Sequence, residues 1–220
     1  MIAGAVLRVD NIKATFSSLG MFIVTVTASL GILFFCCIIL FAVVTRRNPF
    51  GLLRVSIKAW FISFATTSPV VAIPEMYAGC DDYKIAQSTS RFGCPLASAL
   101  KADGPAAFIA CAVLFVAQTG TTPISSGTIV VIWLLTSVSV LAIPPIPSAS
   151  IVITMTILSS VGVSTSSTAY LYTIDWLLDR FRSGLSTLSS MYGVAIVDHV
   201  SQKRKRTKLD LDTDMDFTYF

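Results

Sequence analysis

Long apolar stretches alternate with short polar segments along this chain. One runs from Ser17 to Val44 without a charged side chain, and another, which holds a cluster of charges, covers Ala169 to Val197. A helix crosses the apolar core of a bilayer with about 20 mostly apolar residues, so each stretch predicts a membrane span. A third span is predicted from Phe92 to Gln118, although Lys101 and Asp103 lie inside it.

Two further apolar stretches are interrupted by proline. One runs from Ala59 to Cys80 and contains two prolines, and the other runs from Ile129 to Val163 with three prolines between residues 144 and 147. Proline removes a helical hydrogen bond and breaks a helix. Pairs of short arms of this kind fit re-entrant hairpins better than full spans. We therefore expect helical hairpins near residues 50–80 and 129–163.

Composition narrows the class of protein. Hydrophobic residues make up 54% of the 220 residues and charged residues 13%, whereas soluble domains carry about 25% charge. The sequence therefore predicts an all-α integral membrane protein. The net charge of +4 comes largely from short basic clusters, which argues against nucleic-acid binding. The cysteines lack metal-type spacing and no nucleophile–base set is present, so neither a metal site nor an enzyme is predicted.

Basic clusters predict the orientation in the membrane. Arg46 and Arg47 follow the first stretch, and the cluster Lys203–Lys208 follows the last one. Such clusters stay on the cytoplasmic side, so we expect a multi-pass protein of the plasma membrane with a cytoplasmic C-terminus. Three spans plus two hairpins put both clusters on one side, which a full span at residues 59–80 would not do.

The terminal segments are predicted to lie outside these spans. Residues 1–16 are expected to form the end of a preceding span and a loop, and residues 202–220 a charged cytoplasmic tail. The cluster Lys203–Lys208 could also bind anionic lipids. The end of the chain, Thr218 to Phe220, fits a Ser/Thr-x-hydrophobic tail that could add as a strand to a PDZ-type groove.

The most informative polar segment lies within the last stretch. No charged residue or histidine occurs between Gly104 and Ile174, and then Asp175, Asp179, Arg180 and Arg182 follow within two helical turns. An ionised side chain at bilayer depth is costly unless it faces a partner or a wet cavity. A carboxylate beside a guanidinium suits a zwitterion with an extra acid group. The alternative is that Asp179 and Arg182 only pair with each other.

Four segments of the chain match motifs of one known family. Residues 44–50 resemble its V-T-R-K-N-P-[FW], and residues 90–95 its T-R-F-V-L-P. Residues 101–105 stand where the family has N-M-D-G-T. The strongest match covers Ile174 to Ser201, which aligns with D-W-F-L-D-R-x-R and G-I-V-E-H-L-S without a gap. The chain thus resembles the dicarboxylate/amino acid:cation symporters of the excitatory amino acid transporter type.

The resemblance implies a fold of eight spans and two re-entrant hairpins, assembled as a trimer. Residues 17–201 would be the transport, substrate-binding domain, with three spans plus two re-entrant helical hairpins. The scaffold half with the trimer interface would be missing. Either the sequence is a partial gene product, or it needs a partner such as a full-length relative.

The resemblance also assigns roles in substrate binding. Asp179 would bind the substrate amino group, and Arg182 the side-chain carboxylate. Ser183 stands where the family has a threonine near the substrate. The family's substrate-contacting serine in the first hairpin tip falls on Pro69 here. Contacts from the two hairpin tips are expected at Ser68, Pro69, Ile146 and Ser150.

The family's cation sites are altered. Its first asparagine is Lys101 here, its second asparagine is Ser186, and its later aspartate is Ser190, whereas Asp103 is retained. We hypothesise that Lys101 acts as a tethered cation beside Asp103 in place of sodium, because an ammonium group repels a sodium ion and sodium needs oxygen ligands.

Together these observations predict a secondary active symporter of glutamate or aspartate with altered or weakened sodium coupling. No cofactor is expected other than Na⁺ as a coupling ion. The alternative is a truncated or degenerate subunit of the same family that does not transport.

Overall fold

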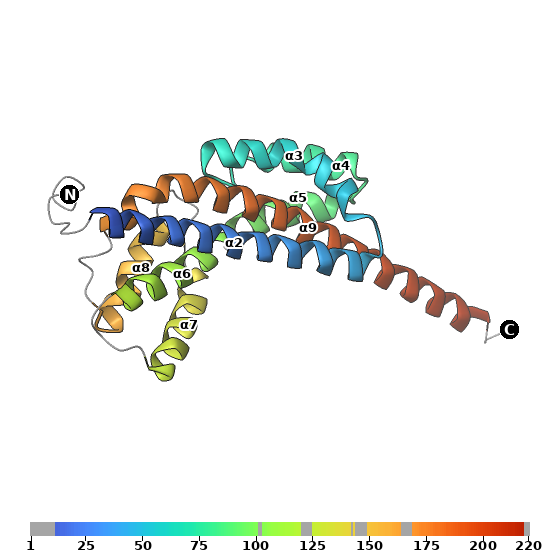
Figure 1. The fold of residues 1–220 in the computed structure, drawn as a ribbon. Helices are drawn as coiled ribbons and strands as arrows, with labels where there is room; N and C mark the ends of the chain where they lie inside the picture. Colours follow the sequence, from blue (N-terminus) through green and yellow to red (C-terminus); the bar gives the residue numbers. More distant parts are fainter. Residues whose placement is uncertain are drawn as a thin grey trace.

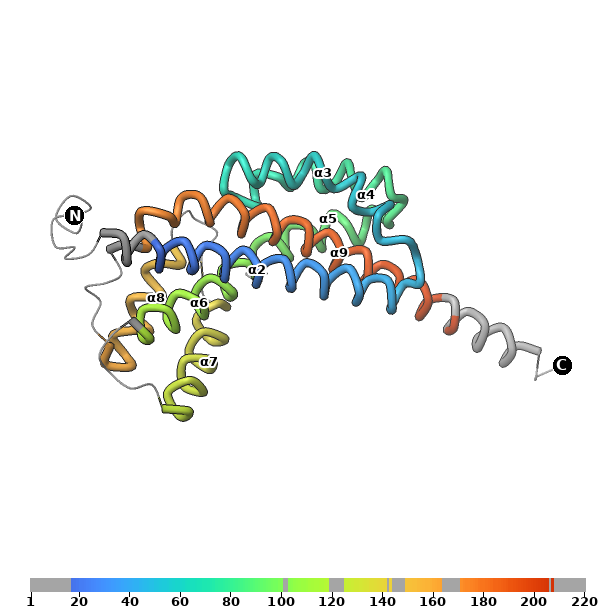
Figure 2. Tube along the Cα trace, in the orientation of Figure 1, coloured from blue at the N-terminus to red at the C-terminus, as the bar shows by residue number. Residues whose placement is uncertain are grey.

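The computed structural model describes residues 12–100, 103–119, 125–141, 143, 149–163 and 169–217 (Figure 1). Figure 2 shows the course of the chain as a tube in the same orientation. Every regular element within these ranges is a helix, as predicted for an all-α protein. The helices are α2 (Ile12–Thr45), α3 (Pro49–Thr66), α4 (Ile73–Asp82), α5 (Gln87–Leu100), α6 (Asp103–Thr119), α7 (Ser126–Val140), α8 (Ala149–Ser160) and α9 (Ala169–Phe217).

Helix α9 is the centre of the arrangement. It lies beside α2 and also packs against α3, α5 and α6, so that α3, α4 and α5 cover one part of it and α6 and α8 another, while α7 packs on α6 and α8 (Figure 1). Two clusters of buried apolar residues follow this division. Along α9, the members of one cluster end at Leu185 and those of the other begin at Met191. The polar residues of α9 lie alongside and between them.

The first helix pair is explained by its local sequence. Asn48 caps α3, since its side chain accepts a hydrogen bond from the Phe50 amide, and Pro49 stands at the first helical position. Helix α3 ends where Thr67 adopts a left-handed conformation with φ 55°. Helix α4 then folds back against α3. The two helices are so close that a Cβ on Gly79 would lie 2.9 Å from the carbonyl oxygen of Val55 in α3.

The helix break predicted between residues 59 and 80 is therefore present. Helices α7 and α8 form the second pair and pack on α6, but most of the proline segment between them, residues 144–148, lies outside the described residues. Re-entry of either pair from one membrane face stays a prediction.

The predicted spans differ in outcome. By length and hydropathy, the described ranges contain two helices that could cross a membrane, Ser17–Thr45 and the segment Gln87–Gln118, which includes the undescribed residues 101 and 102. The first matches the predicted span at residues 17–44. Helix α9 does not meet this test, because charges and hydroxyl side chains lower its hydropathy, and it continues as a helix to Phe217.

Helix α5 runs through Pro95 without ending. Proline has no amide hydrogen, so the carbonyl of Arg91, four residues earlier, loses its helical partner. The hydroxyl of Tyr77 in α4 donates to that carbonyl oxygen at 3.3 Å. This replacement bond ties α4 to α5 and lets the proline remain within the helix.

Candidate functional site

A buried arginine lies between two carboxylates on one face of α9. The Nη2 atom of Arg182 donates to Asp175 Oδ1 at 2.7 Å and to Asp179 Oδ1 at 2.9 Å. The Arg182 side chain is 0% exposed and that of Asp175 2%. Spacings of three and seven residues place all three side chains on the same face of a helix. Asp179 and Arg182 therefore do pair with each other, and Asp175 is a second partner of the same arginine.

Some buried polar atoms of this cluster have no hydrogen-bond partner. Among the described residues, Nε and Nη1 of Arg182 and Oδ2 of Asp175 are buried without a hydrogen-bond partner. A buried charged group without partners is costly, and the N–H groups on Nε and Nη1, one on either side of the engaged Nη2, can each donate to a carboxylate oxygen. The two carboxylates exceed the one guanidinium by a negative charge, which favours a cationic group nearby. The cluster can therefore accept a molecule with both a carboxylate and an ammonium group.

An aromatic ring from another helix covers the arginine. The guanidinium carbon of Arg182 lies 3.9 Å from the centre of the Phe108 ring on α6, a geometry in which the ring face attracts the cation. Phe108 is itself buried and makes an edge-to-face contact with Phe22 of α2, with ring centres 5.9 Å apart. The orientation of the guanidinium is thus fixed from outside α9 as well.

The beginning of α6 meets α9 one turn beyond the arginine. The Ser186 hydroxyl donates to Asp103 Oδ1 at 3.2 Å, and the Gly104 amide donates to the same oxygen at 3.1 Å. A Cβ on Gly104 would lie 2.7 Å from the Arg182 carbonyl oxygen, so only glycine allows this approach. The Ser190 hydroxyl donates to the Ser186 carbonyl at 2.6 Å.

The structure thus brings together three of the four predicted ion-site residues, Asp103, Ser186 and Ser190. The fourth, Lys101, lies outside the described residues.

The end of α3 contacts α9 beside the arginine. The Ser183 hydroxyl donates to the Thr67 carbonyl at 3.0 Å, and the Ser63 hydroxyl donates to the Ser183 carbonyl at 2.9 Å. Arg180 Nη1 also donates to the Ala65 carbonyl at 2.8 Å. The same Arg180 nitrogen donates to the Phe64 carbonyl at 3.4 Å. Four hydrogen bonds therefore hold this end of the first helix pair against the residues on either side of Arg182.

Three of the four predicted tip residues lie within the described residues. Ser68 and Pro69 directly follow Thr67 and are half-buried, so the turn that carries them lies next to Ser183. Ser150 is buried near the beginning of α8, a helix that packs on α6 and α9. Ile146 lies outside the described residues.

Sequence reasoning did not assign Asp175 and Phe108 to the site. The seven-residue spacing between Asp175 and Arg182 is a signal for the first, because it equals about two helical turns. No signal in the sequence identifies Phe108, which reaches the arginine only through the packing of α6 on α9.

Comparison with known proteins identifies the family. The profile of the sodium:dicarboxylate symporter family matches residues 1–200. The chain belongs to this family. It is 32% identical to the mouse (Mus musculus) excitatory amino acid transporter 2 over 217 residues, which cover 97% of this chain and 36% of that protein. An excitatory amino acid transporter of Onchocerca volvulus is 29% identical over 214 residues, or 96% of this chain and 42% of that protein.

Membership in the symporter family confirms the resemblance drawn from the four motifs. It makes this chain a member of a family of membrane transporters rather than enzymes, with sodium named as the coupled ion. The chain spans 36–42% of the length of the two relatives.

Proposed function

We propose that this chain forms the substrate-binding part of a secondary active transporter for acidic amino acids such as aspartate or glutamate. The observation that carries the proposal is the buried arginine with unused N–H groups beside two carboxylates. A neutral amino acid would leave those N–H groups unpaired in a buried site, which is costly. An acidic amino acid supplies the carboxylate that satisfies them.

Each charged residue then has a role in recognition. An unpaired N–H group of Arg182 donates to the side-chain carboxylate, with the guanidinium plane kept in place by Phe108. Asp179 accepts hydrogen bonds from the ammonium group. Asp175 positions Arg182. Ser183 contributes at the junction with α3. The two hairpin tips close over the substrate through Ser68, Pro69, Ile146 and Ser150.

Access to this site requires movement. Arg182 is fully buried, so a substrate reaches it only when a covering segment moves away. The end of α3 and the turn that follows are joined to α9 by the four hydrogen bonds described above, and these bonds would break if this segment moved away from α9. Residues 17–201 would act as the moving domain, within a trimer whose scaffold comes from the remaining length that the relatives possess.

The proposal predicts a preference for acids over their amides. We expect the purified, reconstituted chain to bind L-aspartate or L-glutamate at least about 100-fold more tightly than L-asparagine or L-glutamine, because a site built to pair a charged group discriminates strongly against an analogue that leaves it unpaired. Equilibrium binding by isothermal titration calorimetry measures this ratio. Equal affinities would contradict the proposed substrate class, and binding of neither pair would favour a non-transporting subunit.

The described ion-site donors do not fit a strong sodium site. They comprise one carboxylate, Asp103, and two hydroxyls, while one Asp103 oxygen already accepts from Ser186 and Gly104. The hydroxyl of Ser190 donates to its own helix. Sodium, a hard cation, is held by several oxygen ligands. We therefore propose that sodium coupling is weakened in this chain and that Lys101 supplies the missing positive charge.

Restoring the family residues should restore a response to sodium. We expect the double variant Lys101→Asn/Ser190→Asp to bind L-aspartate at least about tenfold more tightly in sodium than in choline, because it removes a repelling cation and adds a carboxylate. The unchanged chain should bind almost equally in both salts. Strong sodium dependence of the unchanged chain would overturn the tethered-cation proposal while leaving the acidic substrate intact. The matched control is Lys58→Asn/Ser189→Asp, which makes the same two changes of charge at other positions.

A further inference from the structure

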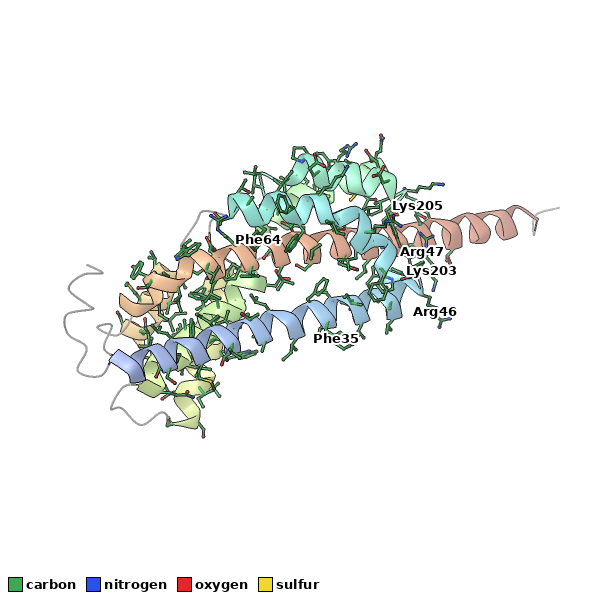
Figure 3. All side chains as sticks on the ribbon, turned by 45° about the horizontal axis from the view of Figure 1, so that its top comes forward. Phe35, Arg46, Arg47, Phe64, Lys203 and Lys205 are labelled. Atoms are coloured by element: carbon green, nitrogen blue, oxygen red, sulfur yellow. The ribbon has the colours of Figure 1, made fainter. Side chains whose placement is uncertain are left out.

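Six basic residues from three segments that are distant in sequence lie together where α2 ends beside α9. We name this surface the basic end. It consists of Arg46, Arg47, Lys84, Lys203, Arg204 and Lys205, all with exposed side chains. Figure 3 shows four of them, Arg46, Arg47, Lys203 and Lys205, around the point where α2 ends beside α9.

A crevice joins the three segments. Arg47 after α2, Lys84 after α4 and His199 of α9 line the same narrow opening, together with Tyr83 and Gln202. The crevice is too small to enclose a ligand, so a ligand would lie across its rim. Basic side chains would then approach it from three directions.

The arrangement of the rim is fixed by one buried acid. Asp198 of α9 accepts a hydrogen bond from the Ala86 amide at 3.3 Å through Oδ1 and from Gln202 Nε2 at 2.7 Å through Oδ2. The first bond anchors the connection between α4 and α5 to α9 and so holds Lys84 at the crevice. Both Asp198 oxygens are engaged within the protein. Two acids stand at the end of α4. Asp81 pairs with Arg91 at 2.7 Å, and Asp82 is exposed.

The length of α2 would place the basic end at the depth of lipid headgroups. The apolar part of α2, Ser17–Thr45, has 29 residues, which at 1.5 Å per residue is about 44 Å. That length matches a bilayer including its headgroup regions, about 40–45 Å. Arg46 and Arg47 come directly after it, and Arg46 turns the chain away from the helix with φ 52°.

We propose that the basic end binds the headgroup of an anionic phospholipid that carries several phosphates, such as a phosphorylated inositol lipid. Arginine and lysine donors form charge-assisted hydrogen bonds with phosphate oxygens. A headgroup with several phosphates can contact cations on all three segments at once, which a headgroup with a single phosphate and a serine cannot do. Such a lipid would join the end of α2 and the part of α9 around residues 199–205 to the connection between α4 and α5.

The test uses the full chain in an uncharged detergent, titrated with a short-chain phosphatidylinositol bisphosphate. In Arg47→Gln/Lys84→Gln we expect the affinity to fall roughly thirtyfold, since each basic residue near a charged lipid surface contributes a factor of about five. The matched control Arg54→Gln/Lys58→Gln removes the same charge from α3, outside the crevice, and should change the affinity by less than about twofold. All four side chains are exposed, so thermal unfolding of both variants should match that of the unchanged chain.

Three outcomes would overturn the proposal. Equal loss in both variant pairs would indicate attraction by net charge rather than a site at the crevice. Equally tight binding of short-chain phosphatidylserine would remove the requirement for several phosphates. Displacement of the lipid by an equal concentration of free inositol phosphate would identify a soluble phosphate as the ligand instead of a membrane lipid.

Discussion

Replacing Arg182 by glutamine is expected to lower the affinity for L-aspartate by a factor of about 30 or more. The side chain is fully buried and is the proposed partner of the substrate's second carboxylate. Truncating one member of a buried, hydrogen-bonded charge pair in a binding interface costs about 2–5 kcal/mol, and 1.4 kcal/mol corresponds to a factor of ten. Equilibrium binding to the reconstituted variant measures the loss.

The neighbouring Arg180 supplies the control. It is partly exposed and donates to the Ala65 carbonyl of α3, so Arg180→Gln removes the same charge from the same helix without touching the carboxylate cluster. We expect its affinity for L-aspartate to change by less than about tenfold. A variant at Arg180 that loses as much affinity as the one at Arg182 would show that the proposed carboxylate partner is wrong.

The effect of the Arg182 substitution on folding stability has to be measured separately from its effect on substrate affinity. Removing one partner of a buried ion pair costs about 3–5 kcal/mol of stability, because Asp175 and Asp179 would stay buried without their cation. In Arg182→Gln/Asp175→Asn one of these carboxylates becomes neutral as well, and we expect much of the lost stability to return. Substrate affinity should not return with it. Recovery of both would mean that Arg182 acts only on stability.

Local sequence features explain the parts of the fold that were predicted correctly. The apolar stretch at residues 17–44 became α2, and the prolines between residues 59 and 80 mark the end of α3 and the beginning of α4. These features depend on backbone chemistry and on hydropathy, which can be read along the chain. The residues that gather around Arg182 were predictable to the extent that they share its helix.

Packing between helices explains what was not predictable. Phe108 and Gly104 belong to α6 and reach Arg182 only because α6 crosses α9 there. The segment predicted as one span from residue 92 to residue 118 consists of α5 and α6 on either side of residues 101 and 102. The contact between Asp103 and Ser186 spans 83 positions in sequence, and only the family resemblance indicated that the two belong to one site.

The close approach of α6 to α9 can be tested by adding one methyl group. We expect Gly104→Ala to destabilise the chain by about 1–3 kcal/mol, the usual cost of overpacking a well-packed interior. The added Cβ would lie 2.7 Å from the Arg182 carbonyl oxygen and 3.0 Å from Ser186 Oγ. A backbone atom cannot rotate away as a side chain can, so the helices must separate. Thermal unfolding measures the loss.

Gly193→Ala on α9 is the matched control, since nothing lies within 4 Å of its added Cβ. Alanine is the better helix former by about 1 kcal/mol, so this variant should be as stable as the unchanged chain or more stable. Separation of α6 from α9 would also move the backbone of Arg182 and the bond between Ser186 and Asp103. Gly104→Ala should therefore weaken binding of L-aspartate, whereas Gly193→Ala should not. Equal stability and equal affinity in the two variants would mean that α6 does not pack this closely against the arginine.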